Sequence, residues 1–180
     1  MDLTKVIIKT DRLKLVPTSL VYASEMFKEF TEEITTFMYP KAAKEIRETE
    51  DFVSSSIQKM KNGEELQVVI LNKITGEFLG HGGISKLKSE TPELGIWIKK
   101  RAHGNKYGRE AVKGLKKWID DNINYKYVIY PVDKRNTSSR KIAESLGGVV
   151  EDEYKKESMS GNILDEVEYR VYPKSLKFSS

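Results

Sequence analysis

The sequence contains no cysteine and only two histidines, and these absences exclude several kinds of chemistry. Without cysteine there is no disulfide, no thiolate nucleophile and no cysteine-based metal site. His81 and His103 cannot form a metal cluster by themselves, so we expect no metal cofactor. A chain without cysteine also fits a cytoplasmic location, where disulfides are rare.

Long hydrophobic runs are missing as well. No apolar run approaches the roughly 20 residues that a membrane span needs, and the N-terminus carries only the short apolar block 6–8. We therefore expect neither a membrane segment nor a signal peptide. The length of 180 residues predicts a single domain over residues 1–180, with 174–180 as a frayed tail.

Charged residues are abundant in the chain. Charged residues make up 32% of the sequence and hydrophobic residues 38%, which is typical of a folded, highly charged protein and not of a disordered one. The net charge is nevertheless only +4, with a pI near 9.0. This mild excess suits an anionic ligand such as a phosphorylated cofactor and indicates nucleic acid only weakly.

The most informative stretch is the basic segment Lys99–Val112. It follows the apolar run Leu94–Ile98, which predicts a buried strand, and it leads into apolar residues at helical spacing that predict a helix ending near Asn122. A short glycine-containing turn between a strand and a helix directs backbone N–H groups at one place, which suits a phosphate. The alternative is a basic, solvated helix start. The positive side chains around the turn are Lys99, Lys100, Arg101, Lys106 and Arg109.

The turn does not follow the better-known phosphate-binding patterns, since neither G-x-x-x-x-G-K-[ST] nor G-x-G-x-x-G occurs there. Residues 103–108 resemble instead the strand-to-helix turn of the Gcn5-related N-acetyltransferase (GNAT) superfamily. Gly104, Tyr107, Gly108, Glu110 and Ala111 are similar to the branch of ribosomal-protein N-terminal acetyltransferases. The resemblance implies that acetyl-CoA binds here, and the implied cofactor-binding residues are His103, Gly104, Asn105, Lys106, Tyr107, Gly108 and Arg109.

Two residues depart from the pattern of the superfamily. His103 stands where Arg or Gln is usual, and Lys106 stands where the middle glycine is usual. A glycine lets the backbone approach a pyrophosphate closely. Lys106 either crowds that approach or turns outward and supplies charge, and the sequence does not decide between the two.

The rest of the chain predicts strands and helices around one sheet. Predicted strands cover 11–16, 66–71, 78–87, 93–98, 125–132, 149–157 and 167–171, and further predicted helices cover 18–30, 44–61 and a short segment after 136. The pattern alone supports a mixed α/β (α+β) fold. The resemblance spans essentially the whole chain and implies the acyl-CoA N-acyltransferase fold, a single mixed, mostly antiparallel sheet of about seven strands flanked by about four helices.

Two local features interrupt the predicted strands. Pro131 has no N–H to donate, so we expect strand pairing to be interrupted there. Gly80, Gly82 and Gly83 surround His81 within one strand, which indicates a bulge or the close approach of another backbone. We interpret His81 as a half-buried residue of the sheet rather than as a base.

A second motif follows the predicted strand 125–132. Asn136 and Ser139 match an N-x-x-S run that opens a helix in the ribosomal-type branch, although Gly148 replaces the Phe that is usual after that helix. The resemblance implies that Asn136 hydrogen-bonds the pantetheine arm and that Ser139 lies near the cofactor sulfur. Asn and Ser are equally the preferred residues for capping a helix, and the motif alone does not separate the two roles.

The implied reaction is transfer of the acetyl group of acetyl-CoA to a primary amine by direct attack on the thioester. The amine must lose a proton, and the carbonyl oxygen needs a donor as it gains charge. Glu93 is our first choice for the base, although a solvated carboxylate at the head of a strand is the simpler alternative; His81 and Tyr130 come next. In this fold a splayed strand offers backbone N–H groups to the carbonyl, here at Ile96, Trp97 and Ile98.

The thiolate that leaves lacks its usual proton donor. Many members of the superfamily place a Tyr seven residues after the Asn position, but Ala143 stands there, and Ser139 is our substitute. On the acceptor side, the helical insertion after the first strand commonly forms a wall. Residues 37–39, Phe-Met-Tyr, are therefore either pocket residues or ordinary buried residues of a helix connection.

The sequence also allows two other classes of function. A non-catalytic acyl-CoA-binding or sensor protein with the same fold fits the missing Tyr, Lys106 and Gly148. A nucleic-acid binder fits the basic stretch but lacks an aromatic stacking platform, so we expect no nucleic-acid partner. The expected partners are acetyl-CoA and an amine acceptor, which is a protein N-terminus or a small amine, and the chain acts as a monomer or homodimer.

Overall fold

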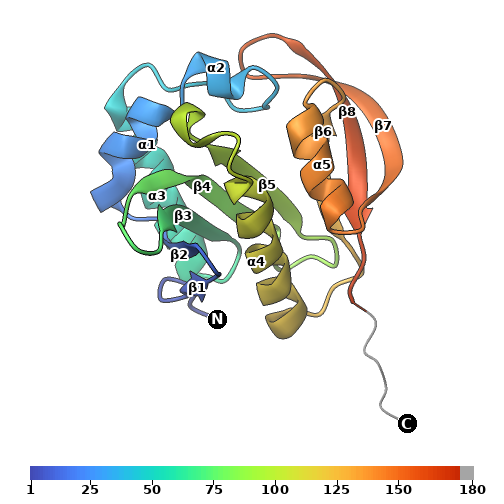
Figure 1. The fold of residues 1–180 in the computed structure, drawn as a ribbon, viewed down its shortest axis with the longest axis horizontal. Helices are drawn as coiled ribbons and strands as arrows, with labels where there is room; N and C mark the ends of the chain where they lie inside the picture. Colours follow the sequence, from blue (N-terminus) through green and yellow to red (C-terminus); the bar gives the residue numbers. More distant parts are fainter. Residues whose placement is uncertain (175–180) are drawn as a thin grey trace.

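The computed structural model describes residues 1–174 as one eight-stranded sheet with helices on both faces (Figure 1). The strand order is β1-β2-β3-β4-β5-β6-β8-β7. The strands are β1 Ile8–Lys9, β2 Leu13–Pro17, β3 Leu66–Asn72, β4 Phe78–Ser85, β5 Glu93–Ile98, β6 Val128–Asp133, β7 Val149–Glu157 and β8 Ile163–Val171. The helices are α1 Ala23–Glu29, α2 Glu32–Thr35, α3 Ile46–Lys61, α4 Tyr107–Asn122 and α5 Thr137–Ser145, with 3-10 turns η1 Leu20–Tyr22 and η2 Lys100–Ala102.

The mixed, mostly antiparallel sheet confirms the predicted fold class, but the predicted numbers of strands and helices were each too low by one. The additional elements are β1, with 2 residues, and α2, with 4. Elements this short carry no hydrophobic period that a sequence pattern can reveal. The predicted frayed tail begins at Lys174, and its residues 175–180 lie outside the described part of the chain. Within the described part, no helix is both long and apolar enough to cross a membrane.

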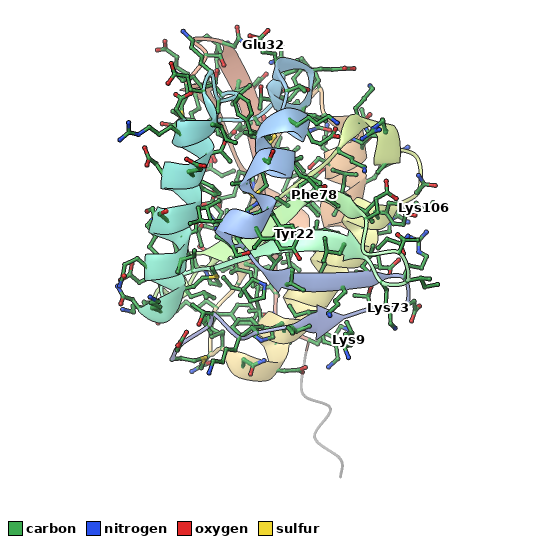
Figure 2. The ribbon with its side chains drawn as sticks, turned by 90° about the vertical axis from the view of Figure 1, so that its left-hand side faces the viewer. Lys9, Tyr22, Glu32, Lys73, Phe78 and Lys106 are labelled. Atoms are coloured by element: carbon green, nitrogen blue, oxygen red, sulfur yellow. The ribbon has the colours of Figure 1, made fainter. Side chains whose placement is uncertain are left out.

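The two faces of the sheet carry separate hydrophobic clusters. On the face in front of the sheet in Figure 1, Leu115 and Ile119 of α4 pack in one cluster with Ile70 of β3. On the opposite face, Met26 of α1 and Val53 of α3 pack with residues of β3, β4 and β5. Figure 2 shows α1 and α3 side by side over that face. The side chains of each central strand therefore divide between an α4 side and an α1–α3 side.

A bulge in β4 follows from its glycines. The register shifts between Ile70 and Leu71 of β3, which pair with Gly80 and Phe78, so one residue of β4 is left without a partner. A Cβ on Gly80 would lie 2.2 Å from the carbonyl oxygen of Trp97, so only glycine permits this approach. The structure thus contains both the bulge and the close backbone approach, which the sequence offered as alternatives.

The central strands β5 and β6 are parallel and diverge after a single registered pair, Glu93 with Ile129. The Ile129 N–H donates to the Pro92 carbonyl at 2.8 Å. Backbone groups alternate in direction along a strand, so the next donor of β6 facing β5 would be residue 131. Pro131 has no N–H, and the ladder ends there, as the sequence predicted. An open gap between β5 and β6 follows.

Candidate active site

The turn before α4 presents a row of free backbone donors. Gly104 and Lys106 both adopt the left-handed conformation, with φ of 85° and 60°, and Lys106 is the residue that precedes α4. Within residues 1–174, the backbone N–H groups of residues 104–109 donate to no protein acceptor, whereas the Glu110 N–H donates to the Lys106 carbonyl at 3.2 Å. Such donors at a helix N-terminus form a site for an anion.

The side chains around the turn hold it in place. Glu110 accepts hydrogen bonds from the Arg12 backbone N–H at 2.8 Å, from Arg12 Nε at 2.7 Å and from the Thr10 hydroxyl. On the other side of the turn, His103 Nε2 donates to the Ile98 carbonyl at 2.7 Å. These contacts fix α4 to the first two strands and the turn to the end of β5. The role of Glu110 could not be predicted from the sequence, because its partners lie about 100 residues away in the chain.

The positive charge at the turn is smaller than the sequence suggested. Lys99 is buried and paired with Glu77, and Lys100 and Arg101 are paired with acidic residues before α3. Within the described residues, Lys106 and Arg109 form no ion pair. Lys106 is exposed, and Figure 2 shows it at the edge of the molecule. Among the described residues, Lys106 is thus an unpaired, exposed positive charge at the turn.

The gap after β5 exposes backbone groups of that strand. Because the Pro92 carbonyl faces β6, the alternation of backbone groups directs those of Ile96 and Ile98 to the same side. The backbone of Trp97 faces β4 instead, where Trp97 pairs with His81, and its side chain joins the cluster on the α1–α3 face. Of the three predicted residues in β5, Ile96 and Ile98 thus direct backbone groups into the gap.

The other wall of the gap combines β6 with α5. The Asn136 side-chain oxygen accepts from the Ser139 N–H at 3.2 Å, which is the capping role that the sequence allowed. The Ser139 hydroxyl lies 2.8 Å from the hydroxyl of Tyr130, which is only 2% exposed. Burial raises the pKa of Tyr130 to about 12, so Tyr130 stays protonated and can donate to Ser139. The sequence named both residues but did not indicate this contact.

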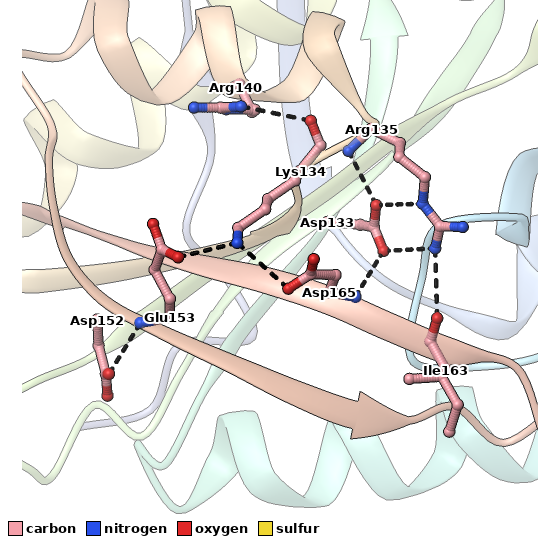
Figure 3. A network of polar contacts seen from close by, with 8 residues as sticks. All are labelled: Asp133, Lys134, Arg135, Arg140, Asp152, Glu153, Ile163 and Asp165. Atoms are coloured by element: carbon pink, nitrogen blue, oxygen red, sulfur yellow. Dashed lines mark hydrogen bonds and ion pairs between the residues drawn. The ribbon is translucent and has the colours of Figure 1, made fainter.

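A polar network fixes the turn that carries Asn136 (Figure 3). The carboxylate of Asp133, whose side chain is fully buried, accepts bonds from Arg135 Nε and Nη2, both at 2.8 Å, and from the backbone N–H groups of Arg135 and Asp165. The hydrogen bonds from Arg135 lower the pKa of Asp133 to about 2. Lys134 pairs with Glu153 at 2.8 Å and with Asp165 at 3.4 Å. The network ties the end of β6 to β7 and β8.

Two open cavities meet at β5. The larger, of about 740 Å³, lies between β5, the α4 turn, β6 and α5, and the smaller, of about 470 Å³, lies on the α1–α3 face. The predicted cofactor-binding residues, Glu93 and Tyr130 all line the larger cavity except Asn105, whose side chain donates to the Ala102 and His103 carbonyls within the turn. The residues shared by both cavities are Met38, Pro40, Glu93, Leu94, Gly95, Ile96 and Trp97.

Two of the predicted bases line the smaller cavity, and one of them also lines the larger. Glu93 lines both cavities, and its half-buried carboxylate is 2.8 Å from Lys86 Nζ. His81 lines the smaller cavity and is buried, not half-buried as predicted; its Nε2 shares a hydrogen bond of 2.9 Å with Thr18. Burial lowers the pKa of His81 to about 4, so its imidazole is neutral and weakly basic near pH 7. Of these two residues, Glu93 alone lines both cavities.

Glu166 is a site residue that the sequence analysis missed. It lines the larger cavity, is 6% exposed, and has one carboxylate oxygen with no hydrogen-bond partner among the described residues. Burial raises the pKa of the Glu166 carboxyl, an effect that the nearby Tyr154 hydroxyl partly opposes. The final strand pattern gave no signal for it, because the sheet alone brings β8 next to β6 at this point.

Comparisons with known proteins point to one family. A family model described as an acetyltransferase (GNAT) domain matches residues 12–149, and no curated protein sequence matches significantly. Among solved structures, RimL, a ribosomal L7/L12 alpha-N-protein acetyltransferase in complex with coenzyme A, superimposes with a TM-score of 0.82 at 14% identity over 93% of this chain and 98% of its own. The microcin C7 self-immunity acetyltransferase MccE, in complex with acetyl-CoA and AMP, gives 0.80 at 20% identity over 91% and 93%. A GNAT-family acetyltransferase from Bacillus anthracis gives 0.78 at 18% over 93% and 98%.

Proposed function

Because this chain belongs to the GNAT acetyltransferase family and is an N-acetyltransferase, we propose that it moves the acetyl group of acetyl-CoA directly to a primary amine. The observation that carries the proposal is the row of backbone N–H groups of residues 104–109, which donate no hydrogen bond within the described residues. This row lies beside the gap between β5 and β6. The likeness in fold to RimL supports a place in the ribosomal-protein-type branch.

The pyrophosphate of acetyl-CoA binds at the turn before α4, where Lys106 and Arg109 add positive charge. The pantetheine arm then lies in the gap, with the backbone of Ile96 on one side and Asn136 on the other. The Asn136 oxygen is used by the helix cap, so its Nδ2 is the group that donates to the arm. This arrangement brings the thioester to the place where the two cavities meet.

The chemistry follows from the groups at that place. Glu93 takes a proton from the ammonium group, directly or through water, and the neutral amine attacks the carbonyl carbon. The N–C bond forms, the C–S bond breaks, and backbone N–H groups of Ile96 or Ile98 stabilise the oxyanion between the two events. The leaving thiolate takes a proton from Ser139, which regains one from Tyr130 at 2.8 Å; Tyr130 is reprotonated from solvent.

Calorimetric titration of acetyl-CoA into the purified protein tests the binding step. We expect one-to-one binding in the micromolar range for wild type and for Lys106→Gly, because glycine readily adopts the left-handed conformation of the turn. Lys117→Ala, which removes one exposed positive charge from the same helix away from the turn, is the control and should bind like wild type. No binding by any of the three proteins would overturn the assignment of the turn. Release of free thiol with an amine then tests the transfer step.

A further inference from the structure

The smaller cavity is apolar and of a size that small-molecule sites commonly have. It has about 470 Å³ and lies on the acceptor side of β5. Trp97 and Phe30 both line it, and their ring centroids lie 4.8 Å apart. The other large apolar side chains that line it are Met26, Met38, Phe52, Leu94, Ile96 and Met159.

The same cavity has polar lining residues, among them Lys41, Thr49, Gln67 and Ser85, and two of its titratable groups are engaged in other contacts. The Glu48 carboxylate accepts from the backbone N–H groups of Lys44 and Glu45 in the cap of α3, and His81 is neutral and bonded to Thr18. Glu93 is the carboxylate at the junction with the larger cavity. Glu93 thus supplies negative charge at the reaction end of the cavity, whereas the side chains packed around Trp97 are apolar.

The apolar surface continues at the mouth of the cavity. Tyr39, Phe52 and Met159 are each about half exposed, at 46%, 46% and 53%. The Met159 N–H donates to the Tyr39 carbonyl at 2.9 Å, so the loop before α3 and the β7–β8 turn are held together over the opening. Exposed large apolar residues that gather around a cavity mark a binding site for an apolar ligand.

The absence of a side chain at Gly95 leaves open space inside the smaller cavity. A Cβ added to Gly95 would meet no atom within 4 Å, and its φ does not lie in the left-handed region. The space above Gly95 lies between Glu93 and Trp97 on the same face of β5, because side chains alternate along a strand. A ligand can therefore extend from the carboxylate of Glu93 over Gly95 to the ring of Trp97.

We propose that the acceptor is a primary amine joined to a bulky apolar group, aromatic or branched aliphatic, which occupies this cavity while its ammonium group meets Glu93. The inference rests on the proposed function, because the amine must reach the thioester from this side. Polyamines and amino sugars fit less well, since their further charges and hydroxyls would lose water where they pack against Trp97, Phe30 and the methionines.

Matched amines test the acceptor class with wild-type protein. Thiol release from acetyl-CoA is measured with 2-phenylethylamine, ethanolamine and putrescine, and with dipeptide amides that begin with phenylalanine or serine. We expect kcat/KM to be at least about ten-fold higher for 2-phenylethylamine than for ethanolamine or putrescine, and for the phenylalanine than for the serine dipeptide amide. The reason is that the phenyl group is buried in the cavity. Equal or higher kcat/KM for ethanolamine, putrescine or the serine dipeptide would overturn the inference and leave the transferase activity intact.

Variants localise the preference to the cavity. Gly95→Leu fills the open space, and Phe52→Ala removes part of the wall without touching the larger cavity. Phe52→Ala should raise KM for 2-phenylethylamine at least about five-fold and leave KM for ethanolamine within about two-fold. Gly95→Leu, at a residue that lines both cavities, should raise KM for 2-phenylethylamine more than KM for ethanolamine. Ile74→Ala, which removes a 94% exposed apolar side chain elsewhere, is the control and should change neither. An unchanged preference in both cavity variants would overturn the inference.

A binding measurement separates failure of this inference from failure of the proposed function. Calorimetry with 2-phenylethylamine is carried out on protein saturated with CoA. If no amine releases thiol, but 2-phenylethylamine binds to wild type and not to Gly95→Leu, the cavity assignment stands and the catalytic proposal fails. If 2-phenylethylamine neither reacts nor binds, the cavity assignment itself is wrong.

Discussion

At the scale of single residues, Lys106 occupies a left-handed conformation where the resemblance expects glycine, and such a residue costs about 1 kcal/mol relative to glycine. We expect Lys106→Gly to raise the free energy of unfolding by up to about 1 kcal/mol. Gly104→Ala, at φ 85° with open space around an added Cβ, should lower it by about the same amount. Urea denaturation measures both changes.

The control for this pair is Lys117→Gly, inside α4, where glycine lowers helix stability by about 1 kcal/mol. The changes in the free energy of unfolding caused by Lys106→Gly and Lys117→Gly should therefore have opposite signs. A Lys106→Gly protein that is less stable than wild type would contradict the left-handed conformation of the turn.

His81 makes stability depend on pH. Burial lowers its folded pKa to about 4 from the ordinary value of 6.5, so the unfolded chain takes up a proton first as the pH falls. The stability that neutral His81 contributes is fully present above pH 6.5 and is lost as the pH falls to about 4, a change of about 3 kcal/mol. His81→Gln, which keeps a polar partner for Thr18, should show a flatter dependence in urea denaturation at pH 7.5, 5.5 and 4. Parallel curves for the two proteins would count against a neutral, buried His81.

Residue roles were predictable from the sequence only where the partners are close in the chain. Asn136 and Ser139 are three residues apart, and their capping contact was among the predicted roles. The pairing of Lys99 with Glu77 and of Arg101 with Glu29 joins residues 22 and 72 positions apart, so these cations were wrongly counted as part of the phosphate site. Only the fold decides which charges remain unpaired.

At the scale of secondary-structure elements, Pro131 ends the pairing of β5 with β6. Pro131→Ala restores an N–H on the side of β6 that faces β5, where the Leu94 carbonyl is the next acceptor in the ladder. We expect the strands to pair further and the gap to narrow, so that the Kd for acetyl-CoA rises several-fold. Calorimetry measures the Kd, and hydrogen exchange should reveal new protection at residue 131.

The control for this prediction is a second proline change outside the gap, Pro173→Ala, after the end of β8, which should leave the Kd unchanged. Protection at residue 131 with an unaltered Kd would mean that the gap is not where acetyl-CoA binds. The interruption at Pro131 was predictable, because it follows from one missing N–H. That β5 is the strand whose pairing ends there became known only from the strand order.

The link between β6 and α5 depends on Asp133. Its pKa of about 2 lies below the ordinary value of 3.8, so its contribution is present above pH 3.8 and is lost as the pH falls through 2. We expect Asp133→Asn to lower the free energy of unfolding at pH 7 by about 2 kcal/mol, because Arg135 loses its charged partner. Because Ser139 is positioned by the same turn, kcat should fall as well.

Asp152→Asn is the matched control, since Asp152 is exposed on β7 and its carboxylate, among the described residues, accepts only from the neighbouring Glu153 N–H. It should change the free energy of unfolding by less than about 0.5 kcal/mol in urea denaturation. Equal effects of the two substitutions would show that the contacts of Asp133 in Figure 3 do not stabilise the fold.

At the scale of the whole molecule, the order of strands and helices was predictable because hydrophobic periods set it, whereas the cavities were not. The larger cavity exists because the ladder between β5 and β6 has one registered pair. The smaller one exists because α1, α3 and the β7–β8 turn meet over Gly95. Both depend on contacts between segments far apart in the chain, which no local pattern encodes.

The sheet is divided by the gap into a part with β1–β5 and a part with β6–β8, which α4 and α5 connect where Gly108 approaches Ile142. A ligand in the larger cavity contacts both parts, at the α4 turn and at Asn136 and Ser139. Acetyl-CoA at 100 times its Kd should therefore stabilise the fold by about 2.7 kcal/mol and raise Tm by about 5 to 10 °C. Hydrogen exchange should slow in β5 and α5 together. ATP at the same concentration is the control, because it can reach the α4 turn but lacks the pantetheine arm, and it should protect that turn alone. Protection by acetyl-CoA confined to one part would contradict binding across the gap.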